Sequence, residues 1–523
     1  MSFETDLLEH YHLTMKDLDL RCRPGSFSRL SRPYDLPSFK KVIGRLDEAI
    51  HKKEKTILYG DYDVDGLTST AIMKIALDEK GLVPGFFTPN RYKEGYGLNT
   101  DRVKQFAQKG YHLIVCVDNG VSAKEAVDMA HSLGMEVLAI DHHEIPKADR
   151  APLDALFHDQ ESGFLKSYHC SAASLAYFVA SYLLGRDDEY LATLAGLAVF
   201  SDVMPLVENN LEFAKIALDS LNKNKYSNLV MLCEKESFNY DDILFKINPS
   251  LNAIGRVEKE ELATINATRF LLSPSDKVKN ITRCQHILQV YQKRKDIVKN
   301  IPFDKSKELS SEHGFVTCVS SYSGLTGLFA GKLLRDKKIP VLVLAPEDQN
   351  PDLLVGSIRA PRGYHFDTFL TKHKNLFIAS GGHERACGIT FPENKFFQVA
   401  TTFLTECEGQ ALEKKEEKDD AIPLTIEDLT FEHYAFYEKF FPFGEGFEAP
   451  KFSLTLPSQA FSFSPSGKLA YSFSSNGEGK VVAFSSFDKI QQKELLTCEG
   501  SLGFDTYQGK KQVVFRIEDI KEN

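Results

Sequence analysis

The chain has 523 residues, of which 42% are hydrophobic and 26% charged, a composition typical of globular proteins and a length that predicts three to four domains. It has no run of about 18 apolar residues to cross a bilayer and no signal-peptide pattern in its acidic start, so we expect a cytoplasmic protein without a membrane partner. Its nine cysteines include no CxxC pair, so we expect reduced thiols and neither a disulfide framework nor a zinc site. The net charge of -10 argues against a generally basic nucleic-acid coat but leaves a local positive groove open.

Apolar runs alternate with helical stretches from about Lys55 to Asp202. TILYG, HLIVCVDNG and MEVLAIDHHE predict strands, and LTSTAIMKIALDEKG and AKEAVDMAHSLG predict the helices between them. This alternation is typical of βαβ units and a parallel sheet with both faces covered. LATLAGLAVFSD predicts a buried helix that carries an acid, Asp202, at its end.

The rest of the chain predicts a connector and two further domains. Residues 276–303 read as one long polar helix, and FVTCVSS, LTGLFAGKLLRDK and IPVLVLAP begin a second α/β pattern. From about residue 421, five short β-type pieces separated by Gly, Ser, Asn and Pro suggest a small barrel of the OB type. We therefore expect two α/β domains, at 1–275 and 304–420, joined by a long helix at 276–303, and a C-terminal β-barrel at 421–523.

Acidic residues follow each of the three predicted parallel strands. Asp61, Asp63 and Asp65 come directly after the first strand, Asp118 ends the second and Asp141 ends the third. Ligands of open α/β sheets bind outside the carboxyl ends of the strands, so we expect these side chains to converge. Two carboxylates about 4 Å apart repel by about 4 kcal/mol at an effective dielectric constant near 20, so such a cluster requires cations.

His142 and His143 directly follow Asp141 and turn the acidic set into a mixed carboxylate and imidazole set. This combination suits Mn²⁺ or Mg²⁺ better than zinc or calcium. Each aspartate alone fits equally well as the N-cap of the next helix, and a histidine pair alone fits a surface or core position. The three motifs together, within about 80 residues, favour a metal site.

Taken in order along the chain, these motifs resemble those of the DHH phosphoesterase superfamily and, within it, the RecJ-type single-strand-specific exonucleases. The resemblance rests on five segments of the first domain: GDYDVDG (60–66), VDNGVS (117–122), DHHE (141–144), SDVMPLVEN (201–209) and LNAIGR (251–256). Farther on, SGGHERACG (380–388) is similar to the GGH motif of the DHHA1 domain, and PFGEGFEAPKF (442–452) to the lead-in of the RecJ OB domain. The resemblance implies a DHH domain, a connecting helix, a DHHA1 domain and an OB domain with the boundaries given above.

The resemblance also implies roles for individual residues. Two divalent cations, Mn²⁺ preferred or Mg²⁺, are expected on Asp63, Asp65, Asp118, His142 and Asp202, with Asp118 as the bridging carboxylate. Asp61 and Asp141 are expected to support these ligands, and His143 to contact the scissile phosphate. The residues expected to bind substrate are Asn252, Arg256, Ser357, Arg359, Gly381, Gly382 and His383.

The implied function is a 5′-to-3′ exonuclease that releases 5′-mononucleotides from single-stranded DNA in repair and recombination, with a helicase and a single-strand-binding protein as partners. Two alternatives stay open: a phosphodiesterase for short oligonucleotides or cyclic dinucleotides, which normally lacks the OB barrel, and a non-catalytic strand-binding scaffold, which has lost its metal ligands. The segment 157–174 departs from the family's usual asparagine-proline pattern, and Tyr322 stands where a DHHA1 histidine is typical. The metal core therefore reads as intact and the end recognition as diverged.

Overall fold

The computed structural model describes residues 2–146, 150–160, 163–165, 168–223, 225–413, 421–464, 469–484, 490, 494–507 and 510–521. The chain divides into two compact units, one of residues Gly25–Glu416 and one that combines Met1–Pro24 with Glu417–Asn523. Within the described residues, no helix combines the length and the apolarity needed to cross a membrane.

A five-stranded parallel sheet forms the centre of the first domain, which confirms the predicted βαβ pattern. Its strand order is β2-β1-β3-β4-β5, with β1 Thr56–Tyr59, β2 Gly85–Phe87, β3 Leu113–Val117, β4 Glu136–Asp141 and β5 Ala155–His158. Alternate residues face opposite layers, so that Val115 belongs to one hydrophobic core and its neighbour Ile114 to the other. Both faces are covered, as parallel sheets require.

Nearly all-apolar helices cover one face of this sheet. Helix α4 (Val64–Glu79) packs against α8 (Ala172–Leu184) and α9 (Glu189–Ser201), and most of their residues are buried. Helix α9 ends beside its C-cap Asp202, which confirms the predicted buried helix with an acid at its end. The other helices of this domain are α3 Pro37–Lys52, α5 Arg91–Glu94, α6 Thr100–Gln108, α7 Lys124–Ser132, α10 Glu208–Asn222, α11 Ser227–Met231, α12 Tyr240–Asp242, α13 Asn248–Val257 and α14 Leu262–Leu271.

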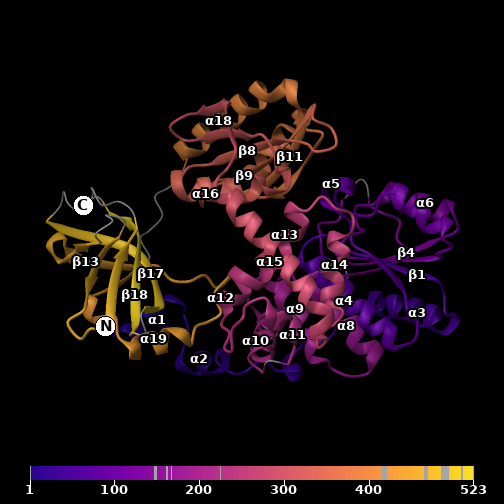
Figure 1. Ribbon diagram of the computed structural model, residues 1–523, viewed down its shortest axis with the longest axis horizontal. Helices are drawn as coiled ribbons and strands as arrows, with labels where there is room; N and C mark the ends of the chain where they lie inside the picture. Colours follow the sequence, from indigo (N-terminus) through magenta and orange to yellow (C-terminus); the bar gives the residue numbers. More distant parts are fainter. Residues whose placement is uncertain are drawn as a thin grey trace. The chain divides into compact units, whose positions relative to one another are not determined.

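The long connecting helix is present as α15, Lys277–Lys299, and lies beside α13 (Figure 1). After it comes a six-stranded sheet of order β10-β11-β9-β8-β7-β6, in which only β7 and β8 pair in parallel. The strands are β6 Phe303–Ser310, β7 Phe315–Val319, β8 Val341–Pro346, β9 Leu353–Arg359, β10 Ala379–His383 and β11 Ala386–Pro392.

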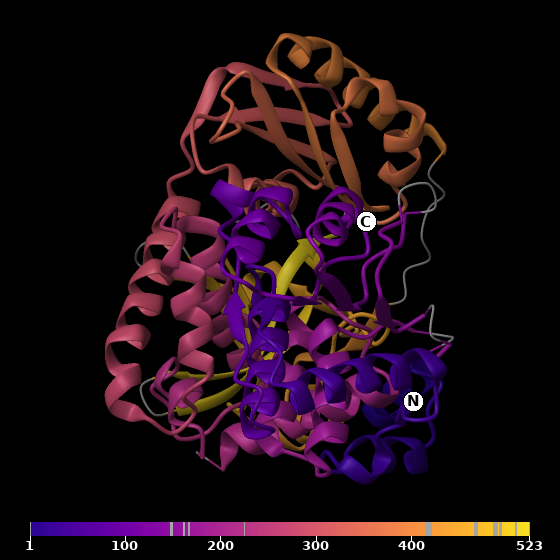
Figure 2. The same ribbon diagram turned by 90° about the vertical axis from the view of Figure 1, so that its right-hand side faces the viewer.

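Helix α16 (Thr326–Lys337) covers one face of the second sheet, and α17 (Phe366–Lys372) and α18 (Phe396–Glu413) cover the other. Figure 2 shows the last two in orange on one side of the sheet. In β8, Val343 packs into the core that includes Phe329 of α16, whereas Leu344 packs into the core that includes Phe403 of α18. This layer arrangement confirms a second α/β domain.

The C-terminal sheet has seven strands in the order β12-β13-β17-β18-β16-β15-β14, with β16 and β18 paired in parallel. Its strands are β12 Ile422–Leu424, β13 Phe452–Pro457, β14 Ser462–Phe463, β15 Ala470–Phe473, β16 Gly479–Ala483, β17 Leu495–Tyr507 and β18 Lys510–Ile520. The five predicted β-type pieces are all strands, in agreement with an OB-type barrel.

Two N-terminal helices pack onto this C-terminal sheet together with α19 (Phe431–Glu438). Phe3 and Leu7 of α1 (Phe3–His10) and Leu18 of α2 (Met15–Arg21) share one hydrophobic core with its strands. The expected first domain, 1–275, therefore begins with two helices whose apolar side chains are buried against the last hundred residues of the chain.

Candidate metal centre

The carboxyl ends of the central strands carry the predicted acids and bring them together. Asp61, Asp63 and Asp65 follow β1, Asp118 follows β3, and Asp202 approaches from the end of α9. Among the described residues, three sets of side chains offer ligand atoms that all lie within 4.8 Å of one another: a mixed group (Asp65, Asp118, His142, Asp202), an acidic group (Asp61, Asp63, Asp118) and a third set (Asp118, His142, His143).

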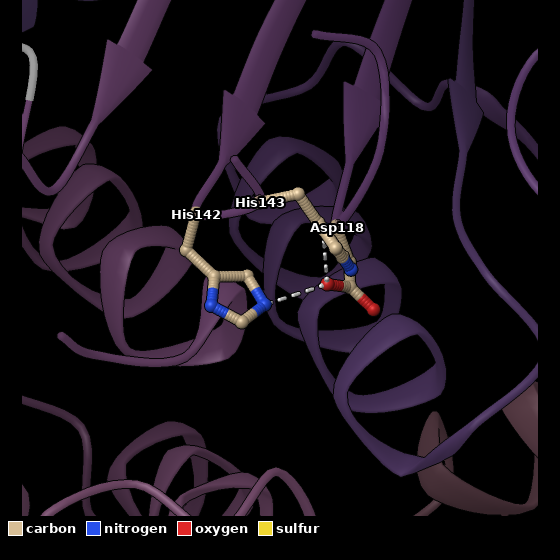
Figure 3. Close-up of side chains that lie close together, drawn as sticks. All are labelled: Asp118, His142 and His143. Carbon is tan, nitrogen blue, oxygen red and sulfur yellow. Dashed lines mark ion pairs between the residues drawn. The ribbon is translucent and has the colours of Figure 1, made fainter. Parts of the chain in front are cut away.

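His142 lies at the centre of the mixed group. Its Nε2 is 3.3 Å from Oδ1 of Asp118, 3.4 Å from Oδ2 of Asp202 and 3.5 Å from Oδ2 of Asp65. Figure 3 shows the ring of His142 pointing toward the carboxylate of Asp118, each from a loop that follows a strand. One imidazole nitrogen that faces three carboxylate oxygens at such distances has the arrangement of ligands around a common ion.

Asp65 is held by the start of helix α8. Its two oxygens accept hydrogen bonds of 2.7 Å from the backbone N–H groups of Ala172 and Ala173, directly after the N-cap Ser171. Free N–H groups and the positive end of the helix dipole both stabilise a negative charge there. The carboxylate is thus fixed in place by backbone atoms.

Asp63 is both a helix cap and a member of the cluster. It is the N-cap of α4, and its Oδ1 accepts a hydrogen bond of 3.1 Å from Gly66 N. Gly66 packs so closely on the preceding loop that a Cβ atom would lie 2.5 Å from the backbone of Asp61. The absence of a side chain at Gly66 therefore allows the three aspartates to fold back over the helix start.

Asp118 belongs to all three sets and has an unusual backbone. Its φ of +63° is in the left-handed region, which non-glycine residues adopt at a cost on the order of 1–3 kcal/mol. Its backbone N–H donates a hydrogen bond of 3.0 Å to the carbonyl oxygen of Ile140 in the neighbouring strand β4. A shared, central carboxylate is the position expected for a ligand that bridges two ions.

Asp141 organises the loop with the two histidines. Its Oδ1 accepts from the backbone N–H groups of His142 and His143 and lies 2.9 Å from His143 Nδ1, while Oδ2 accepts from Val121 N. Burial opposes the charge, but the hydrogen bond with His143 and the two nearby imidazoles lower the pKa of Asp141 to about 2. Asp141 thus orients His143 and belongs to none of the three ligand sets.

The centre contains buried polar atoms that require a partner. Among the described residues, Oδ1 of Asp61, Oδ1 of Asp118 and Nε2 of His142 have no hydrogen-bond partner. Burial and then neighbouring carboxylates raise the pKa of Asp61 and Asp118 well above the ordinary value, and burial and then Asp202 raise the pKa of Asp65 to about 7. Divalent cations would supply the missing partners and the missing positive charge, so the residues present fit such ions.

A cleft of about 350 Å³ lies between the first and second domains. Of the predicted substrate residues, Ser357 and Gly381 line it, and Ser357 Oγ is 3.0 Å from Thr326 Oγ1. The remaining ones do not belong to the described lining of this cleft: Asn252, Arg256, Arg359, Gly382 and His383. His383 is exposed on the edge strand β10.

Helix α13 links the metal centre to the predicted substrate residues. Asn252 accepts a hydrogen bond of 3.1 Å from Val64 N and donates one of 3.1 Å to Ser201 Oγ, so both of its polar atoms tie the first aspartate loop to the end of α9. Burial and the charge of Arg91 lower the pKa of Arg256 to about 10. An anionic ligand would relieve this repulsion between two guanidinium groups.

Sequence reasoning missed two residues near the site. Arg91 follows β2, lines the cleft and acts electrostatically on Asp61. The ring of Tyr96 lies 5.2 Å from that of His143, and its hydroxyl is 3.4 Å from the carbonyl oxygen of Asp118. Both residues lie in the glycine-rich segment PNRYKEGYG, which was the available signal in the sequence. Because β2, the strand before it, has only three residues, no strand was predicted there and the segment was not assigned to the edge of the sheet that holds the site.

Comparisons with known proteins place the chain among relatives of one kind. A family model described as DHH family, N-terminal domain, matches residues 55–200, and one described as RecJ OB domain matches residues 421–519. The chain is 28% identical over 438 residues to a single-stranded-DNA-specific exonuclease RecJ of Bacillus subtilis, covering 79% of this chain and 53% of the relative. It is 26% identical over 471 residues to the Escherichia coli protein of that name, covering 80% and 78%.

The fold is similar to that of a crystal structure of RecJ in complex with Mn²⁺ from Thermus thermophilus. The TM-score is 0.78 at 22% identity, and the match covers 94% of this chain and 72% of the other. This likeness shows the fold. The chain spans about half the length of the Bacillus subtilis relative and about three quarters of the Escherichia coli relative.

Proposed function

We propose that this chain, a RecJ-type protein of the DHH family, is an exonuclease that degrades single-stranded DNA from the 5′ end and releases 5′-mononucleotides. The observation that carries the proposal is the converging set of carboxylates around His142, with its unpartnered buried atoms, at the carboxyl ends of parallel strands. The RecJ OB domain match in the same chain adds a module suited to single strands.

The mixed group and the acidic group would each hold one divalent cation, and Asp118, which belongs to both, would bridge them. Two such ions supply Lewis-acid polarisation of the phosphoryl group and a water of lowered pKa. The rest of the chemistry falls to the protein's own residues.

His143 has its Nδ1 tied to Asp141, which leaves Nε2 to contact a non-bridging oxygen of the scissile phosphate. Arg256 and Arg91 would bind the phosphates on either side. Ser357 and Gly381 would contact the backbone of the strand in the cleft, and Gly382 would contact it just outside the described lining. For Arg359 and His383 we propose contacts with the strand outside the described cleft lining.

The proposal extends to the domains and to the cell. We assign catalysis to the DHH domain, residues 1–275, which the helix at 276–303 connects to the DHHA1 domain. The DHHA1 domain, residues 304–420, forms the far wall of the cleft. The OB domain, residues 421–523, captures the strand. We further propose that the enzyme works in the cytoplasm in DNA repair and recombination, on strands supplied by a helicase and covered by a single-strand-binding protein.

The test uses a 50-nucleotide single strand labelled at the 5′ or the 3′ end, a dinucleotide, and Mn²⁺. A labelled mononucleotide should be the first product from the 5′-labelled strand, whereas the 3′-labelled strand should shorten gradually. Asp118→Ala should lower kcat by at least about 10³-fold, because it removes a ligand of both groups. Cleavage of the dinucleotide alone would identify a short-oligonucleotide phosphodiesterase, and absence of Mn²⁺ binding would identify a non-catalytic scaffold.

A further inference from the structure

Asp159, directly after the edge strand β5, is a buried carboxylate outside the three ligand sets. Its side chain is fully buried. Oδ1 lies 3.0 Å from Nδ1 of His158 and 2.7 Å from Gln160 N, and Oδ2 lies 3.1 Å from Nδ1 of His169 and 3.3 Å from Cys170 N. Both oxygens therefore organise the segment that follows the strand.

His158 connects this carboxylate to the loop with the two histidines. Its Nε2 is 2.9 Å from the backbone carbonyl oxygen of His143, and since a carbonyl only accepts, Nε2 is the donor. Burial opposes a charged ring, but the hydrogen bond with Asp159 raises the pKa of His158, and Gln160 N also lies 3.2 Å from its Nδ1. The backbone of His143 is thus held by Asp141 through its N–H group and by His158 through its carbonyl oxygen.

On its other side, Asp159 fixes the start of helix α8. It accepts from Cys170 N, and Asn210 donates a hydrogen bond of 2.7 Å to the carbonyl oxygen of His169. These contacts fix the two residues directly before the N-cap Ser171. The next two N–H groups of that helix hold the carboxylate of Asp65.

We propose that Asp159 is a positioning residue of the metal centre. One buried carboxylate couples the loop that presents His142 and His143 to the helix start that holds Asp65, and so sets the spacing of ligands from two distant parts of the chain. Its effect on hydrolysis rests on the proposed function, whereas its effect on metal binding does not.

The test compares full-length Asp159→Ala, Asp159→Asn, His158→Ala and His158→Gln with the wild type. Calorimetric titration gives the Mn²⁺ affinity, and hydrolysis of 5′-labelled single-stranded DNA gives kcat, KM and the Mn²⁺ concentration for half-maximal rate. Asp159→Ala and His158→Ala should weaken Mn²⁺ binding about 10- to 100-fold and raise the half-maximal Mn²⁺ concentration equally, with KM for DNA unchanged. His158→Gln should recover most of the affinity, because its amide can still donate to the His143 carbonyl, and Asp159→Asn should be intermediate.

Asp154→Ala is the matched control. Asp154 also accepts from a backbone N–H, that of Val137, and contacts a histidine, His131, but it lies at the other end of β5. The Asp154→Ala variant should therefore lose thermal stability but keep the Mn²⁺ affinity of the wild type. The proposal is overturned if His158→Ala and Asp159→Ala both keep an Mn²⁺ affinity within twofold of wild type. It is also overturned if Asp154→Ala loses as much Mn²⁺ affinity as these two variants. Should Asp159→Ala not fold, the pair His158→Ala and His158→Gln decides.

Two results separate this proposal from the proposed function. A wild-type protein that binds Mn²⁺ without cleaving single-stranded DNA overturns the proposed function alone, and the calorimetric comparison still decides on Asp159. A wild-type protein that binds no Mn²⁺ overturns both.

Discussion

Among single residues, Asp65 makes the free energy of unfolding of the metal-free protein depend on pH. In the folded chain its pKa is about 7, above its ordinary 3.8, so the folded protein keeps a proton that the unfolded chain releases between these values. The contribution of Asp65 to the free energy of unfolding of metal-free protein should therefore fall as pH rises from about 4 to 7 and level off above. The raised pKa of Asp61, Asp63 and Asp118 acts in the same direction.

Thermal unfolding in EDTA and in Mn²⁺ across this pH range checks the sign. Because protons compete with the cation for the same carboxylates, the rise in Tm produced by Mn²⁺ should be larger at pH 8 than at pH 5.5. In Asp65→Asn the decline of metal-free stability with pH should be shallower. A metal-free Tm that rises from pH 5 to pH 8 would contradict the crowding of uncompensated carboxylates.

The two adjacent histidines should separate binding from chemistry. His142→Ala removes the nitrogen that faces three carboxylates and should abolish binding of at least one Mn²⁺. His143→Ala should lower kcat about 10²- to 10³-fold, the usual cost of a lost donor to the reacting group, with much less effect on Mn²⁺ affinity. Calorimetry and single-turnover rates distinguish them, and equal loss of Mn²⁺ from both variants would place His143 among the ligands.

Local pattern was sufficient to predict Asp65, Asp118 and His142, because the ends of parallel strands meet at one edge of a sheet whatever the details of packing. It was insufficient for Arg91, which follows a strand too short to be predicted, and for Asp159, whose link to the metal centre runs through the contact of His158 with the carbonyl oxygen of His143. Asn252 was predicted as a substrate contact, and the structure shows both of its polar atoms engaged within the protein.

At the scale of elements, helix α13 can lie close to the aspartate loop because it carries Gly255. A Cβ atom there would lie 2.6 Å from the carbonyl oxygen of Tyr62. Gly255→Ala should displace the loop and lower kcat at least about tenfold, since an ångström of misplacement at a catalytic site can cost on the order of 10². Gly44→Ala, in helix α3 with open space around it, should stabilise the protein by about 0.5–1 kcal/mol and leave kcat unchanged. Denaturant unfolding and steady-state kinetics on both variants check this contrast.

Long periodic elements were predicted well, and short ones were not. Helices α9 and α15 have more than ten residues each, and their apolar or polar character extends over the whole length. Strand β2 has three residues, and β10 is a glycine-rich edge strand without an apolar alternation. Such strands form because the neighbouring strand offers hydrogen bonds, which a local pattern does not show.

For the whole molecule, the N-terminal helices should fold only with the C-terminal domain. In a chain of residues 1–413, Phe3, Leu7 and Leu18 lose their partners, and each fully buried side chain of this kind is worth about 1.5–3 kcal/mol. This variant should aggregate, whereas residues 25–413 should remain monodisperse and bind Mn²⁺ with weakened affinity for single-stranded DNA. Size-exclusion chromatography and calorimetry compare the two, and equal solubility would show that the helices do not need the sheet.

The packing of the same two helices also determines when they can fold during synthesis of the chain. They emerge before the strands that bury them, which are made roughly 20 to 80 s later at about 5–20 residues per second. During that interval the apolar side chains of the two helices remain exposed. A chaperone or transient contacts within the nascent chain must cover them. Burial of the two N-terminal helices therefore waits until the strands of the C-terminal domain have been synthesised.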